Sequence, residues 1–75
     1  MEQLNRIKGI SLPERLTFID EWVFSERNRR LVKRKLIDGV TFEQIAEEFK
    51  LSVNQTKNIV YDVIDIMVEN KTSGK

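Results

Sequence analysis

The sequence predicts an all-α protein, a small helical bundle of about four helices with a C-terminal helix-turn-helix. Apolar residues recur at intervals of three and four along most of the 75 residues, which is the spacing of one helix face. Only one Pro and three Gly interrupt the chain, and Ser or Thr repeatedly precedes an apolar run, where it can cap a helix. A chain this short buries only about 60% of its unfolded surface, so we expect one core. The expected divisions are an N-terminal arm or short helix over 1–10, a helix-turn-helix domain over 11–70 and a disordered tail over 71–75.

The first strong helix start is at Ser11, because Ser11 and Glu14 have the spacing of a capping box and Pro13 lies in the first turn. An apolar stripe follows, formed by Leu12, Leu16, Ile19 and Val23, with Phe18 and Trp22 beside it. Five aromatic residues on apolar faces are predicted to be core rather than a stacking platform, namely Phe18, Trp22, Phe24, Phe42 and Phe49.

The second and third helices are delimited by caps. Ser25 is the N-cap of the second, which ends at Asp38-Gly39, since Gly suits the left-handed conformation after a helix. Thr41 begins the third as part of a second capping box with Gln44, and Val40 and Ile45 are placed as a hydrophobic staple across it. The inward face of this short helix is expected to consist of Ile45, Ala46 and Phe49.

The last helix is predicted to run from a third capping box, Ser52 with Gln55, to about Glu69. Polar positions recur along it at three and four and define a narrow solvent stripe of Gln55, Asn58, Asp62, Asp65 and Glu69. The intervening residues are nearly all apolar. Many are β-branched and would also suit a strand, but a lone strand would have no partner in this chain.

Composition excludes several classes of function. The absence of Cys and His removes thiolate and imidazole metal ligands, Cys and Ser–His nucleophiles, and disulfides. Paired acids such as Glu47 and Glu48 show no sign of a pocket, so we expect no enzyme, no catalytic residue, no metal and no cofactor. No apolar run approaches the roughly 20 residues of a membrane span, and the N-terminus lacks a signal-peptide core. We therefore expect a soluble cytoplasmic protein that does not enter a membrane.

Charge is segregated along the chain. The segment from Ser25 to Asp38 holds six basic residues against two acidic ones, a net +4, which leaves −3 for the rest of a chain whose total is +1. Between Asn58 and Asn70 the charged residues are all acidic. A polyanion that meets the basic segment is therefore expected to avoid the end of the chain.

The spacing from Thr41 to about Asp62 is that of a helix-turn-helix, with Ala46 small where two helices cross and Leu51 in the turn. Within it, Ile-Ala-Glu-Glu-Phe-Lys-Leu-Ser over 45–52, followed by Thr-Lys-Asn over 56–58, resembles the DNA-binding half of sigma-70 region 4 and of LuxR-type regulators. The resemblance extends upstream through 12–15 and 26–30 and covers about two thirds of the chain. Two departures are Lys50, where the family has Gly, and Thr56, where it buries Val or Ile. Thr56 implies a weaker or a hydrogen-bonded anchor for the last helix.

The resemblance implies which residues contact DNA. An α-helix fits the major groove with its N-terminal residues against base edges. The family's reading positions fall on Val53, Asn54, Lys57 and Asn58, with Tyr61 at the margin. Phosphate contacts are expected from a row of arginines and from the capped helix N-termini, namely Arg27, Arg30, Arg34, Thr41 and Ser52.

The leading hypothesis is a small bacterial or phage transcriptional regulator that binds double-stranded DNA sequence-specifically. Two alternatives remain open. One is a protein-interaction module that contacts RNA polymerase or another regulator, with DNA contact secondary. The other is the DNA-recognising small subunit of a phage packaging machine, where similar domains occur on oligomers.

A homodimer is also predicted, because the last helix is apolar around most of its circumference and one covering helix shields only one face. The expected interface consists of Ile64, Met67 and Val68. In the competing arrangement, a monomer, Leu4, Ile7 and Ile10 fold back over the second face.

Overall fold

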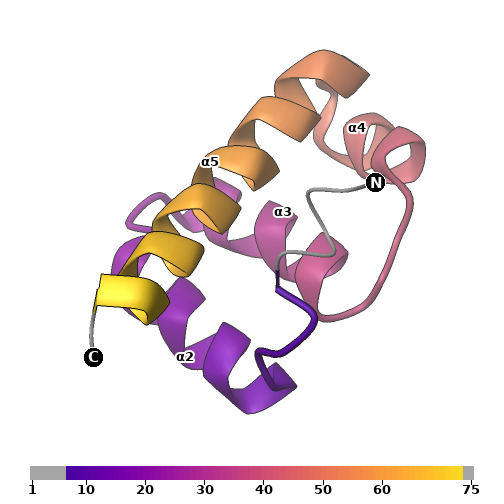
Figure 1. Cartoon of the computed structure of the whole chain (residues 1–75). Helices are drawn as coiled ribbons and strands as arrows, with labels where there is room; N and C mark the ends of the chain where they lie inside the picture. Colours follow the sequence, from indigo (N-terminus) through magenta and orange to yellow (C-terminus); the bar gives the residue numbers. More distant parts are fainter. Residues whose placement is uncertain (1–6, 74–75) are drawn as a thin grey trace.

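The longest helix, α5, crosses the molecule; α3 and α4 pack against it, and α2 packs on α3 (Figure 1). The computed structural model describes residues 7–73, with side chains as far as residue 69. Its helices are α2 (Leu12–Trp22), α3 (Glu26–Leu36), α4 (Phe42–Phe49) and α5 (Val53–Ser73), and the described residues contain no strand. Helix α3 contacts all the others, whereas α4 lies against the first turns of α5 and α2 lies near its other end. The predicted all-α class and the four helices are confirmed.

Each helix begins at its predicted cap. The backbone N–H of Glu14 donates to Ser11 Oγ (3.4 Å), and Ser11 N–H donates back to Glu14 Oε1 (3.3 Å). Ser52 and Gln55 form the same reciprocal pair, at 3.1 and 3.0 Å. Hydroxyl caps also open α3 and α4, where Ser25 accepts from Asn28 N–H and Thr41 accepts from Gln44 N–H. These bonds satisfy backbone donors that have no partner inside the helix, so they determine where each helix starts.

The far end of α5 lies beyond its expected position. Its backbone remains helical to Ser73, past the predicted limit of the domain at residue 70 and into the predicted tail. No Pro or Gly stands between Ser52 and Gly74, so the sequence of α5 contains no residue that would interrupt the helix.

The core lies between α3 and α5 and receives side chains from every helix. Its fully buried apolar members are Ile19, Leu31, Val32, Ile45, Val60 and Ile64. Ile7 and Ile10, which precede α2, belong to the same cluster. Both are buried in the chain's own core, and Ile10 lies near Met67 of α5, which agrees with the fold-back expected in the competing arrangement; Leu4, the third residue of that prediction, lies outside the described residues.

This arrangement corrects the predicted dimer interface. Ile64 is 0% exposed and Met67 2% exposed, so both side chains lie inside the chain's own core. Val68 is half-buried against it. The prediction was wrong for Ile64 and Met67 because it left Ile7 and Ile10 out of the core. Ile64 is therefore not available for contact with a second copy, and Met67 exposes only the 2% of its surface that lines the groove between α5 and α2.

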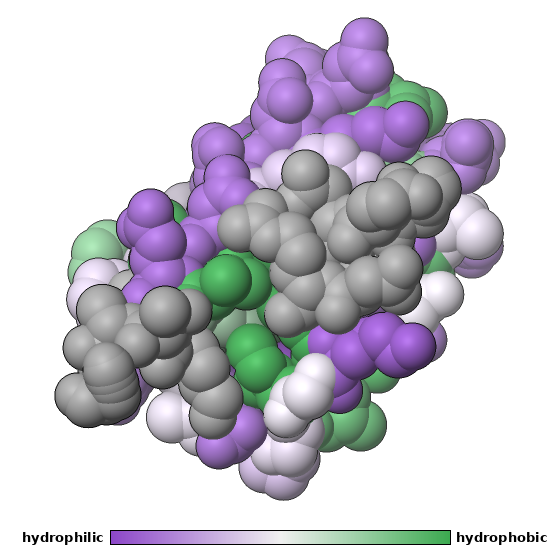
Figure 2. All heavy atoms as spheres, in the orientation of Figure 1, coloured by the Kyte–Doolittle hydropathy of each residue, from purple (hydrophilic) through white to green (hydrophobic). Residues whose placement is uncertain are grey.

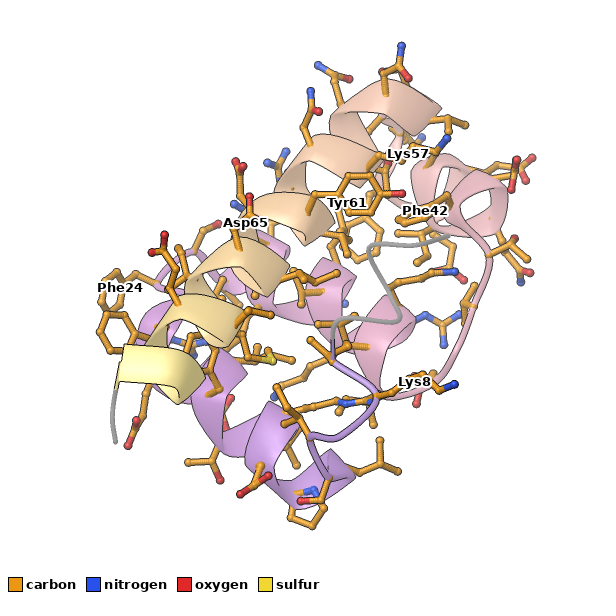
Figure 3. The ribbon with its side chains drawn as sticks, in the orientation of Figure 1. Lys8, Phe24, Phe42, Lys57, Tyr61 and Asp65 are labelled. Atoms are coloured by element: carbon orange, nitrogen blue, oxygen red, sulfur yellow. The ribbon has the colours of Figure 1, made fainter. Side chains whose placement is uncertain are left out.

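Helix α2 is less buried than its sequence predicts. Trp22 is 45% exposed and Phe24 is 83% exposed, and the latter points away from the body of the protein (Figure 3). Leu12 and Leu16 are exposed as well. The assignment of Trp22 and Phe24 to the core was wrong, because α2 and its C-cap are buried only at Ile19 and Val23. The other three aromatic residues, Phe18, Phe42 and Phe49, are half-buried against the core.

Arg15 joins the N-terminal segment to the rest of the fold. Its guanidinium donates to the carbonyl oxygens of Ile10 (2.9 Å), Leu36 (2.8 Å) and Ile7 (3.0 Å). Leu36 is the last residue of α3, whose final carbonyls lack partners within the helix. One side chain therefore satisfies acceptors from two segments that are distant in sequence.

Replacing Arg15 with Met is expected to lower the free energy of unfolding by about 1.5–3 kcal/mol, because three carbonyls lose a charged donor while the aliphatic stem is kept. Urea denaturation measures the change. Arg27→Met is the matched control, since the Arg27 guanidinium bonds only to its neighbour Asn28 among the described residues, and it should shift the midpoint little. Equal effects of the two substitutions would contradict the role of Arg15.

Candidate nucleic-acid interface

The turn between α4 and α5 passes through a left-handed backbone conformation. Lys50 adopts φ 59° and ψ 46°, and Leu51 N–H donates to Ala46 O at 2.9 Å. Such a conformation costs a residue with a side chain about 1–2 kcal/mol. Lys50 nevertheless adopts this conformation, so the turn is left-handed even though Lys stands where the family has Gly. Leu51 packs against the core beneath the turn.

Thr56 anchors the start of α5 through a hydrogen bond. Its side chain is fully buried, and Oγ1 donates to Ser52 O at 3.0 Å. Of the two anchors considered for this position, the hydrogen-bonded one is observed. The hydroxyl is thereby satisfied in the core, where an unpaired one would be destabilising.

The predicted base-reading residues lie along the first turns of α5. Asn54 and Asn58 are exposed and one helical turn apart, so their amides share one side of the helix. Val53, Lys57 and Tyr61 are half-buried. The structure therefore brings all five to one end of α5, with the two asparagines the most accessible.

Phe42, the first residue of α4, supports two of these side chains. Tyr61 packs edge-on against its ring, with centroids 5.7 Å apart, and Lys57 Nζ lies 5.9 Å from the ring centre (Figure 3). The contact of an ammonium group with an aromatic face is favourable and restricts where the lysine points. Phe42 thus couples the position of α4 to the orientation of Lys57 and Tyr61.

Lys35 is a basic residue of this region that the sequence analysis missed. Its Nζ donates to Val40 O (3.0 Å) and lies 4.4 Å from the centre of the Phe42 ring. This places a positive charge beside the N-terminus of α4, where the helix dipole is also positive. Its position depends on how the connection from α3 to α4 folds back, which no periodicity in the sequence reveals.

The arginines predicted to bind phosphate differ in their surroundings. Arg27 and Arg30 are exposed and line a surface hollow between α3 and α4, together with Glu48 and Phe49. Arg34 instead donates from Nε to Glu48 Oε1 (3.1 Å) and from Nη1 to Asp38 Oδ2 (3.4 Å). Arg34 can therefore bind a phosphate only if its hydrogen bonds to these two carboxylates are broken.

The hydroxyls of Thr41 and Ser52 are occupied as caps, so these two residues offer anions the backbone N–H groups of the first helical turns rather than their side chains.

The contribution of the Glu48–Arg34 contact to stability depends on pH. The hydrogen bond from the guanidinium lowers the pKa of Glu48 below its ordinary value of 4.5. The unfolded chain then takes up a proton on Glu48 at a higher pH than the folded protein does. The stabilisation is present above about pH 4.5 and is lost as the pH falls through the lower, folded-state pKa.

We expect the urea midpoints of the parent protein and Glu48→Gln to differ most near neutral pH and to converge as the pH falls from about 4.5 toward 3. The side chains of Arg34 and Glu48 keep 37% and 35% of their surface in solvent, so the difference will be small. Chemical denaturation at several pH values checks this. A difference that stays constant over the whole range would show that Glu48 does not titrate against Arg34.

Hydrophilic and hydrophobic residues gather at different places on the face of the molecule drawn in Figure 2. Figure 2 shows hydrophilic residues over the end where α4 meets the start of α5, and hydrophobic residues lower down between α5 and α2. The acidic stripe of Asp62, Asp65 and Glu69 is exposed farther along α5, as predicted. The described residues include no group of three acidic side chains that could hold a metal ion. Between residues 7 and 73 no helix combines the length and apolar character that a bilayer crossing requires.

Comparison of the chain with protein families, with curated proteins and with solved structures finds no match. The likeness to sigma-70 region 4 therefore rests on the motif residues themselves.

Proposed function

We propose that this protein binds double-stranded DNA sequence-specifically through α4 and α5 and acts as a small transcriptional regulator of bacterial or phage type. The observation that carries the proposal is the left-handed turn at Lys50, which leads into a capped α5 whose Asn54 and Asn58 side chains are exposed. Such a helix fits the major groove of B-DNA with its first turns against the base edges.

The exposed side chains have the chemistry that base recognition needs. The amide of Asn54 or Asn58 can pair with N6 and N7 of adenine, and the ammonium of Lys57 can reach O6 and N7 of guanine. Val53 supplies an apolar contact suited to the methyl group of thymine, with Tyr61 at the margin. Phe42 restricts the reach of Lys57, which limits the number of base pairs that this lysine can contact.

Phosphate binding is assigned mainly to α3 and to the helix N-termini. Arg27 and Arg30 are exposed beside the end of α4, and Lys35 adds a charge beside its start. The capped first turns of α4 and α5 offer backbone N–H groups. The acidic stripe of α5 is farther along the helix, so it would repel DNA at the opposite end and help to orient the duplex.

Salt dependence tests this assignment. Replacing Arg27 and Arg30 together with Gln should weaken binding to every duplex and reduce the slope of log K against log salt by about two units, because two phosphate contacts are removed. Fluorescence anisotropy with labelled duplexes at several salt concentrations measures it. The control is Glu47→Gln, an exposed change beyond the first turn of α4 that removes no positive charge and should leave the slope unchanged. An unchanged slope in the double variant would place both arginines away from the backbone.

A further inference from the structure

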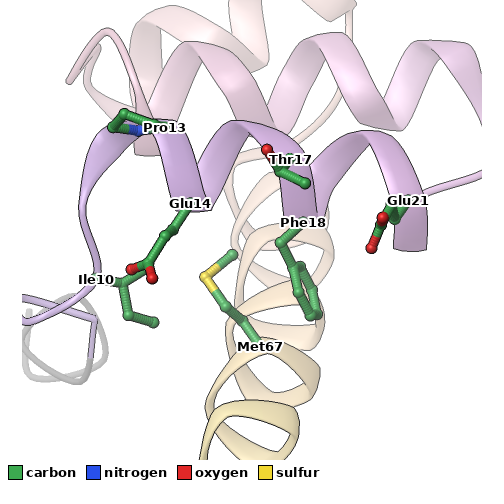
Figure 4. A pocket seen from close by; sticks show the side chains of 7 residues that line it. All are labelled: Ile10, Pro13, Glu14, Thr17, Phe18, Glu21 and Met67. Atoms are coloured by element: carbon green, nitrogen blue, oxygen red, sulfur yellow. The ribbon is translucent and has the colours of Figure 1, made fainter.

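A groove lies between α2 and the C-terminal half of α5, away from the proposed DNA surface. Its volume is about 420 Å³, and apolar side chains of Ile10, Phe18 and Met67 line it. Figure 4 shows Met67 reaching from α5 toward α2, between Glu14 and Phe18. A concave apolar site of this size can hold a large side chain.

Aromatic residues extend the apolar surface at one end of this groove. The Phe18 ring stacks on Trp22, with centroids 5.6 Å apart and planes 17° from parallel. Trp22 is 45% exposed, and Phe24 follows two residues later. Exposed aromatic residues next to a concave site are typical of the positions that contribute most to protein–protein affinity.

The walls of the groove are acidic. Glu14 and Glu21 line it from α2, and their separation of seven residues places them about 10 Å apart along the helix. Asp65 and Glu69 are exposed on the same half of α5, outside the groove itself. The negative potential of these carboxylates repels a polyanion and attracts a positively charged segment.

We propose that the groove binds a short amphipathic segment of a partner protein, with a large apolar anchor flanked by Lys or Arg residues. The anchor enters between Phe18 and Met67, and the basic residues face Glu14 and Glu21. A second copy is a poorer occupant, because symmetric pairing through this face would set these carboxylates against their own counterparts. The groove does not include Asn54 or Asn58, so the segment and DNA can bind together.

The experiment is a selection on the full chain with displayed random peptides of about 12 residues, enough for about three helical turns. The single Trp of the chain, Trp22, stacks on a groove residue, so its fluorescence reports binding of each enriched peptide. The enriched sequences should carry one large apolar residue with Lys or Arg on both sides. Enrichment of acidic or uncharged sequences, or of no sequence, would overturn the proposal.

Two substitutions test whether the peptide binds in the groove. Thr17→Arg places a bulky cation in the groove from an exposed position, and Glu21→Lys reverses one wall charge. Each should weaken peptide binding by about tenfold or more without changing thermal stability or DNA binding. Asp62→Lys is the control, because it makes the same change in net charge outside the groove. Equal losses in Glu21→Lys and Asp62→Lys would show nonspecific attraction and contradict a groove site.

Sedimentation of the parent protein separates a partner from self-association. A monomer that binds the enriched peptides supports the proposal. A dimer that Thr17→Arg dissociates would show that a second copy occupies the groove and would overturn it.

Discussion

Ile45→Ala should lower the free energy of unfolding by about 2–5 kcal/mol, a large part of the roughly 5–15 kcal/mol expected for a whole domain. Ile45 is 0% exposed and belongs to the core cluster between α4, α3 and α5. Its truncation leaves a cavity where α4 is held against the rest of the fold. We expect a partly unfolded protein near physiological temperature, measured by urea denaturation.

The control is Leu12→Ala on α2. Leu12 is 50% exposed and lies outside the core cluster, so its loss should change stability by only about 0.5 kcal/mol. If Ile45→Ala unfolds at the same denaturant concentration as the parent protein, the packing of α4 described here is wrong.

Replacing Asn54 and Asn58 together with Ala should reduce discrimination between a preferred DNA site and its mutated forms by about 2–6 kcal/mol. Each amide is worth about 1–3 kcal/mol when it pairs with adenine, and contacts to separate base pairs are roughly additive. Both side chains are exposed, so folding should be unaffected. Competition binding at fixed salt measures the ratio of affinities.

Asp62→Ala serves as the comparison, since Asp62 is exposed on the same helix but beyond the proposed readers. It should leave discrimination unchanged. If the double Asn variant loses the same affinity for every duplex, neither asparagine reads a base.

Features that depend on neighbouring residues were predictable from the sequence. The four N-caps, Ser11, Ser25, Thr41 and Ser52, each satisfy a donor three residues away, so the spacing of Ser or Thr to its partner is enough to locate them. Gly39 in the left-handed region follows from the same local logic.

Features that depend on packing between distant segments were not predictable. An apolar face on a helix indicates burial, but it does not show how much of that face neighbouring segments cover. For this reason the sequence wrongly places Trp22 in the core and Met67 at a dimer interface. Arg15 contacts carbonyls up to 21 positions away, and such partners leave no periodic signal. The covering role of Ile7 and Ile10 is another contact of this kind.

The candidate site contains features of both kinds. The motif located Asn54, Lys57 and Asn58 on one exposed end of α5, because helical periodicity determines which residues share a face. It could not show that Phe42 contacts Lys57, or that Arg34 is paired with Glu48, since both contacts join different helices.

Selection from a pool of random duplexes, at a stated salt concentration, tests the central claim most directly. We expect the protein to enrich a common short motif, to bind it more tightly than unrelated duplexes by about 10³-fold or more, and to lose that preference in the Asn54 and Asn58 double variant. Failure to enrich any motif, or an affinity that does not change with salt, would contradict sequence-specific DNA binding through α5.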